Sequence, residues 1–132
     1  MDEVLKSNTE MDAGETALAA FCFVSSYYRI PTDPNQLKRE LCLNDKEITE
    51  DDIIRAANIS GLKARLIEVI NNNRFNHIPI PSIAKYLDGS YAVYGGRQSN
   101  GKLRFVNPVS REVSELDDEE VQKKIDKNLI LI

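Results

Sequence analysis

The sequence predicts an α+β fold in which helices pack on an antiparallel sheet. Apolar residues recur at helical spacing in the first 60 residues, whereas short apolar runs separated by turn signals fill the remainder. This segregation favours an antiparallel sheet, since a parallel sheet needs strands and helices that alternate. With 132 residues and a hydrophobic fraction of 42%, the chain can build one packed core, so we expect a single domain over 1–132.

Three helices are expected in the first half. Apolar spacing predicts the first over 12–28. Asp33, followed by a proline that a first helical turn tolerates, predicts a short second helix over 34–42. The third begins at the cap residue Thr49, has acidic residues at the positive end of the helix dipole, and ends at Gly61.

The second half predicts a meander of strands. Apolar and charged residues alternate from Leu62 to Leu66, which is typical of a half-buried strand. Turn signals at 88–89 and 99–101 separate the next apolar runs. A short helix is expected over 117–127, where acidic residues precede basic ones. The expected strands are 62–66 and the apolar runs at 78–86, 91–94, 103–106 and 129–132.

Charge and composition exclude several classes of partner. A net charge of -4 and scattered basic residues argue against nucleic acid. No apolar run is long enough to cross a bilayer, so we expect no direct membrane insertion. The N-terminus lacks the features of a signal peptide. The last apolar run stops without a polar tail, from which we expect a domain excised from a longer protein.

The residues that could carry chemistry are few. Cys22 and Cys42 have no metal-ligand spacing, so both are predicted to be buried free thiols and no metal site is expected. His77 is interpreted as a surface or capping histidine. The sequence has no phosphate-binding loop, so no cofactor is expected.

Three short motifs occur at the ends of predicted helices and strands, and their order along the chain is informative. Asp12-Ala13-Gly14 begins the first helix, Asp88-Gly89-Ser90-Tyr91 precedes a strand, and Val106-Asn107-Pro108 ends the next strand. A helix N-terminus is where a nucleophilic cysteine has a lowered pKa, but Ala13 has no nucleophile.

This order resembles the papain-like peptidase domain that precedes the membrane domain in bacteriocin-processing ABC transporters. That family carries a glutamine, a Cys-Gly pair, a histidine that opens a strand and an Asp-Pro pair. By this resemblance Ala13 takes the cysteine position, Asn107 the aspartate position and Ser7 the glutamine position. Tyr91 takes the histidine position, although the shorter Gly-His form of the motif puts Ser90 there.

The resemblance implies a papain-like fold without peptidase activity. Degenerate domains of this family belong to type I secretion ABC transporters that export RTX toxins and adhesins. The implied function is the recruitment of an unfolded, RTX-like passenger at the cytoplasmic face of the bacterial inner membrane. The implied partners also include the transmembrane and nucleotide-binding domains of the same polypeptide, so that only the parent transporter is an ATPase.

Two alternatives stay open at this stage. The chain could be an active cysteine peptidase that cleaves double-glycine leader peptides or uses another residue such as Cys22, or a structural and regulatory domain that contacts the transporter's own ATPase part. For passenger binding, a groove between helices and sheet is expected, with aromatic side chains at its surface. The candidate aromatic residues are Tyr27, Tyr28, Tyr86 and Tyr91.

Overall fold

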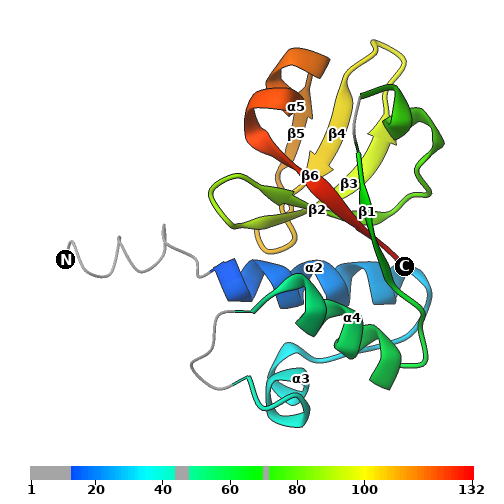
Figure 1. Cartoon of the computed structure of the whole chain (residues 1–132). Helices are drawn as coiled ribbons and strands as arrows, with labels where there is room; N and C mark the ends of the chain where they lie inside the picture. The colour runs from blue at the N-terminus through cyan, green and yellow to red at the C-terminus, as the bar shows by residue number, and fades with distance from the viewer. Residues whose placement is uncertain (1–12, 44–47, 70–71) are drawn as a thin grey trace.

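The computed structural model describes residues 13–43, 48–69 and 72–132 and has an α+β architecture (Figure 1). Its elements along the chain are α2 (Ala13–Tyr27), α3 (Pro34–Glu40), α4 (Glu50–Ile59), β1 (Arg65–Glu68), the 3-10 helix η1 (Asn72–His77), β2 (Ser82–Tyr86), β3 (Tyr91–Arg97), β4 (Leu103–Val106), β5 (Val113–Leu116), α5 (Asp118–Lys124) and β6 (Ile125–Leu131).

One antiparallel sheet of six strands, in the order β1-β6-β2-β3-β4-β5, separates two layers. Helices α2, α3 and α4 lie together on one side of it, and α5 lies on the other side (Figure 1). We call the two sides the helical face and the η1 face, because η1 and α5 contribute to the second core cluster. The expected fold class is therefore confirmed.

Helix α2 covers the helical face of the sheet. Its apolar residues recur every three or four positions, which directs one stripe of side chains against the strands. Ile83 of β2, Val93 of β3 and Ile130 of β6 meet this stripe in one cluster. The fully buried apolar residues of α2 are Ala17, Leu18, Ala20, Phe21 and Val24.

Helix α3 begins as expected and ends early. The Asp33 side chain accepts a hydrogen bond from the backbone N–H of Gln36 at 3.1 Å, which caps the helix. The helix ends at Glu40, two residues before the expected boundary. Cys42 then has φ 56° and is exposed, so the prediction of a buried Cys42 is wrong. The left-handed backbone at this position reverses the chain and turns the thiol outward.

Helix α4 has both of the expected boundaries. The backbone N–H of Thr49 donates to Oδ2 of Asp52 at 2.9 Å, and the structure closes a capping box there. Gly61 follows the helix with φ +83°, a conformation that favours glycine.

Strand β1 lies three residues later than expected, over Arg65–Glu68. It pairs only with β6 in the sheet order, with Leu66 opposite Ile130. Leu66 is 43% exposed. As an edge strand, β1 has a neighbouring strand on one side only, which leaves its side chains more open to solvent.

The end of the chain departs most from expectation. Asp117 caps α5, but the helix stops at Lys124 instead of Lys127. Ile125 is extended and pairs with Tyr86, so β6 begins four residues before the expected strand at 129–132. β6 also lies inside the sheet, between β1 and β2.

Two further differences concern the middle strands. In the expected run 78–86 only Ser82–Tyr86 forms a strand, and a cis peptide bond joins Ile80 to Pro81 before it. Strand β5, over Val113–Leu116, was not expected because only one of its residues is buried. It forms through pairing with β4. None of the helices in the described segments is long and apolar enough to span a membrane.

The cross-strand pair Ile130 and Leu66 offers a test of the sheet order. Ile130 is 1% exposed and Leu66 is 43% exposed. We expect Ile130→Ala to lower the free energy of unfolding by about 2–5 kcal/mol, because it leaves a cavity in the core. The control Leu66→Ala should change it by about 0.5 kcal/mol or less. Urea titration measures both, and equal losses would contradict an inner β6 beside an edge β1.

Candidate functional site

The positions that match the peptidase motifs gather where α2 begins. Ala13 is the first residue of α2, although its side chain, like all of Ser7, lies outside the described residues. The backbone N–H of Tyr91, at the start of β3, donates to Oγ1 of Thr16 in the early part of α2 at 2.9 Å. Val106 pairs with Val93, so Asn107 follows β4 close to the start of β3.

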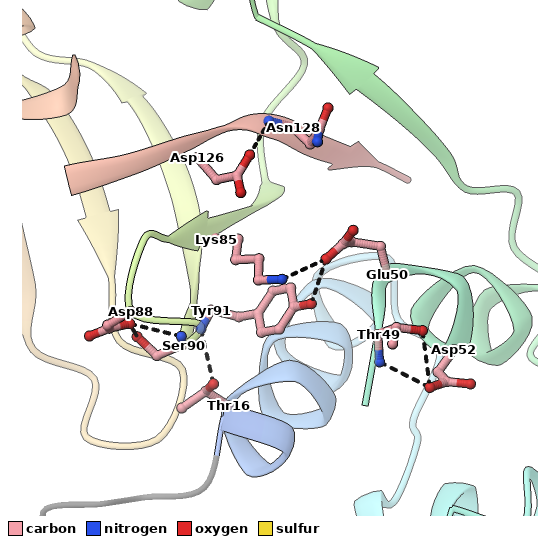
Figure 2. A network of polar contacts seen from close by, with 10 residues as sticks. All are labelled: Thr16, Thr49, Glu50, Asp52, Lys85, Asp88, Ser90, Tyr91, Asp126 and Asn128. Carbon is pink, nitrogen blue, oxygen red and sulfur yellow. Dashed lines mark hydrogen bonds and ion pairs between the residues drawn. The ribbon is translucent and has the colours of Figure 1, made fainter. Parts of the chain in front are cut away.

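The Tyr91 side chain is part of the core rather than of an open cleft. It is 2% exposed, and its hydroxyl donates to Oε1 of Glu50 at 3.0 Å. The same oxygen accepts from Nζ of Lys85 at 3.0 Å. Figure 2 shows these contacts joining β2 and β3 to the first residue of α4. These hydrogen bonds therefore connect the helical layer to the sheet next to the Asp88-Gly89-Ser90-Tyr91 motif.

The charge of Glu50 is stabilised within this network. Partial burial raises the pKa of Glu50, but hydrogen bonds from Lys85 and Tyr91 and the positive charge of Lys85 lower it by more, so the pKa lies below its ordinary value of 4.5. Our sequence interpretation explained Glu50 only as a helix-dipole residue. Its contact with Lys85 joins residues 35 positions apart, which no local pattern indicates.

Ser90, the alternative histidine position, is bound within its own turn. Its hydroxyl donates to Oδ1 of Asp88 at 2.6 Å, and its backbone N–H donates to the same oxygen at 2.8 Å (Figure 2). Such a carboxylate contact orders the β2–β3 turn.

Asn107 caps the turn that follows β4. Its Oδ1 accepts from the backbone N–H of Val109 at 2.8 Å and of Ser110 at 3.0 Å. Its backbone carbonyl accepts from the N–H of Arg111 at 2.9 Å. Asn107, at the position that the resemblance assigns to the aspartate, thus provides a neutral amide that orders the 107–111 turn.

The remaining thiols and the imidazole do not form a reactive pair. Half-buried Cys22 packs against the core of the helical face. His77, the chain's one histidine, is exposed beside Ile67 and Leu131, which belong to the η1 face. The sheet therefore separates His77 from Cys22. Burial raises the pKa of Cys22 above its ordinary value, with a further rise from Asp33 and a partial offset from a Thr32 hydrogen bond, so the thiolate is disfavoured. The expected surface position of His77 is confirmed.

An open groove runs along α2 on the helical face. It has a volume of about 500 Å³. The Arg111 guanidinium lies 4.5 Å from the ring centroid of Phe23, and Arg111 has φ 68°. Our sequence interpretation missed Phe23 and Arg111, because only the turn capped by Asn107 brings them together. The groove is lined by Ala19, Cys22, Phe23, Ser26, Tyr27, Thr32, Pro34, Pro108 and Arg111.

The four candidate tyrosines do not share one groove. Tyr27 lines the groove along α2 and is 63% exposed. Tyr28 packs edge-on against Tyr27, with 5.3 Å between ring centroids. Tyr91 is buried near the other end of α2, and Tyr86 packs against the core of the η1 face. Only Tyr27 and Tyr28 therefore stay together at one surface.

No three histidine, cysteine or carboxylate side chains in the described ranges come close enough together to hold a metal ion. The arrangement at the start of α2 consists instead of hydrogen bonds that are internal to the fold.

Comparisons with known proteins give one family match. The profile of the Peptidase C39 family matches residues 4–132. No curated protein sequence matches the chain.

Three solved structures share the fold over most of their length. The N-terminal peptidase C39 like domain of a toxin secretion ATP-binding protein from Vibrio parahaemolyticus is 20% identical, with a TM-score of 0.74, and the match covers 88% of this chain and 94% of that one. The peptidase domain of Streptococcus ComA, a bi-functional ABC transporter of a quorum sensing pathway, is 24% identical, with a TM-score of 0.77 and 91% coverage of each chain. A double glycine motif protease from an AMS/PCAT transporter, solved in complex with the leader peptide, is 16% identical, with a TM-score of 0.78 and coverage of 92% and 85%.

The lowered pKa of Glu50 predicts a pH-dependent stability. A carboxyl whose pKa is lower in the folded state stabilises the fold above its ordinary pKa of 4.5, and this contribution disappears as the pH falls through the folded value. Glu50→Gln should therefore be less stable than the parent chain at neutral pH, and the difference should shrink on acidification. Urea midpoints across this range measure it. The control Glu68→Gln, on exposed β1, should show no such trend. A Glu50→Gln difference that is constant with pH would refute the assignment.

Proposed function

Because this chain belongs to the Peptidase C39 family, whose profile matches residues 4–132, we propose that it is a degenerate member that binds cargo instead of cutting it. The proposed setting is a type I secretion ABC exporter, in which the domain recruits an unfolded RTX-type passenger at the cytoplasmic face of the bacterial inner membrane. In this proposal, the same polypeptide also carries membrane and ATPase domains. The first solved relative is itself described as part of a toxin secretion ATP-binding protein.

The main support for the proposal is that the side chains at the motif positions make hydrogen bonds that stabilise the fold. Tyr91 is hydrogen-bonded to Glu50, Ser90 to Asp88, and Asn107 to its own turn. A cysteine peptidase needs a thiol activated by a nearby base, and none of these side chains supplies an imidazole. Ala13 supplies no thiol.

The rival assignment of Cys22 as nucleophile is poorly supported. Its pKa is raised, chiefly by burial, whereas reactive cysteines have a lowered pKa. The chain's one histidine, His77, lies on the other side of the sheet.

The groove along α2 is the surface that we assign to the passenger. It is concave and open, and its lining combines the aromatic Phe23 and Tyr27 with the cation of Arg111. Aromatic and arginine side chains contribute much of the binding energy in protein interfaces. One relative was solved with a leader peptide bound, so the fold is compatible with a peptide ligand. Weak affinity is expected, because ordering an unfolded chain costs free energy.

Binding is tested with the isotopically labelled domain and the C-terminal repeat region of a co-encoded secreted protein. We expect backbone amide shifts along the groove with the unfolded repeat region and none with the folded one. Tyr27→Ser should weaken binding by about fivefold or more, as truncated interface residues of this kind do. Leu87→Ser is the matched control, since both side chains are 63% exposed.

The same sample distinguishes the competing functions. Incubation with double-glycine leader peptides should give no product, and measurable cleavage would refute the degenerate assignment. An absence of amide shifts with both forms of the passenger would refute recruitment. The structural and regulatory role would then be favoured, and deletion of the domain should change ATP turnover of the parent transporter without cargo.

A further inference from the structure

A second concave surface lies on the η1 face, away from the groove along α2. It occupies about 460 Å³, a size typical of ligand sites. It lies beside β1, the edge strand, and the end of η1. We call it the η1 pocket, and its lining residues are Arg65, Ile67, Arg74, His77, Ile78, Pro79 and Leu131.

The η1 pocket combines an apolar floor with a polar rim. Ile78 and Leu131 are each 8% exposed, and Ile67 is half-buried beside them. The rim consists of the exposed side chains of Arg65, Arg74 and His77. An occupant that fits both parts has an apolar side chain next to an anionic group.

In the part of the chain that the structure describes, the rim arginines have no acidic partner. Among the described residues, the ion pairs involve Arg55, Lys85, Arg97, Lys123 and Lys124. Neither arginine of the η1 pocket forms an ion pair there, although the chain as a whole has a net charge of -4. A local concentration of positive charge on an acidic protein attracts an anionic partner to this place.

The wall that carries Arg74 and His77 is held rigidly. The Tyr94 hydroxyl donates to the Phe75 carbonyl at 3.0 Å, and the two rings lie 5.1 Å apart. Nε of Arg97 donates to Oδ1 of Asn76 at 2.6 Å. These contacts fix η1 to β3, so less conformational freedom is lost when a ligand binds.

We propose that the η1 pocket binds an acidic segment of the passenger, with aspartate or glutamate carboxylates at the rim and a neighbouring apolar side chain on the floor. This inference rests on the proposed recruiting function and names the class of segment that is recognised. Arginine is suited to the carboxylate because its planar fork matches two oxygens. A nucleic acid calls for a longer basic stripe, and a bilayer surface does not reach a recessed floor.

The test uses short fluorescent peptides and the intact chain. One peptide alternates aspartate with leucine, and its matched partner has asparagine in place of aspartate. Fluorescence anisotropy gives the affinities, and amide shifts give the location. We expect the acidic peptide to bind, to shift Ile67, Arg74 and His77, and to weaken as salt is raised. Equal binding of the asparagine peptide would overturn the proposal.

Substitution of the rim identifies the site. Arg65→Gln combined with Arg74→Gln should weaken the acidic peptide about tenfold, the loss expected for charge-assisted hydrogen bonds at a solvated rim. Arg39→Gln, at another exposed arginine on α3, is the control and should bind normally. Unchanged affinity in the double variant would refute the η1 pocket as the site. So would competition by inorganic phosphate as strong as by the peptide, or retention on anionic vesicles that depends on the same arginines.

The unfolded repeat region separates this inference from the function on which it depends. If the double variant binds the repeat region like the parent chain, recruitment stands and the η1 pocket is refuted. If the acidic peptide binds at the η1 pocket but the repeat region binds nowhere, the pocket stands and recruitment fails.

Discussion

The fold depends on the insertion of its last strand into the middle of the sheet. β6 lies between β1 and β2, and its residues supply both cores: Ile130 faces the helical layer, whereas Leu129 and Leu131 face η1. Arg65 pairs with Leu131, so partners on adjacent strands lie 66 positions apart in the sequence. Without β6, β1 has no partner in the sheet and the two clusters lose their shared wall. The η1 pocket depends directly on this long-range pairing, because β1 provides Arg65 and Ile67 and β6 provides Leu131.

Side chains at the positions that the resemblance assigns to catalysis make structural contacts in this fold. Tyr91 and Lys85 share one carboxylate oxygen of Glu50, which connects the sheet to α4. Asn107 orders the turn that places Arg111 over Phe23. In a peptidase the same positions must remain free to move protons and to contact substrate. Here the hydrogen-bonding capacity of these groups is used within the fold, which fits a domain that keeps its shape for binding.

Local signals predicted the local features well. Asp33, Thr49 and Asp117 begin helices as expected, because capping depends on residues three positions apart. Strand boundaries and side-chain exposure, in contrast, depend on long-range strand pairing, which the sequence pattern does not indicate. Ile125 leaves the expected helix to pair with Tyr86, and Leu66 is exposed because its strand lies at the edge.

The same limit applies to the binding surfaces. The motif positions were recognisable because each is a short stretch of sequence. In contrast, Arg65, Arg74 and Leu131 meet only after β1, η1 and β6 have assembled, so no periodicity or spacing indicates the η1 pocket.

The placement of the two concave surfaces on opposite sides of the sheet has a consequence for a bound chain. The groove reaches the turn after β4 and the η1 pocket reaches β6, and these strands are three positions apart in the sheet. That separation is about 15 Å, to which the sheet adds its own thickness. A flexible chain of roughly a dozen residues covers about 20 Å. Because the two surfaces lie on opposite sides of the sheet, the linking segment must also pass around a sheet edge and is therefore longer than this straight-line length. For a passenger of sufficient length, the second contact then forms at a high effective concentration. Under the proposed function, two weak contacts of this kind would retain a long unfolded polypeptide by avidity, while either one alone would release it quickly.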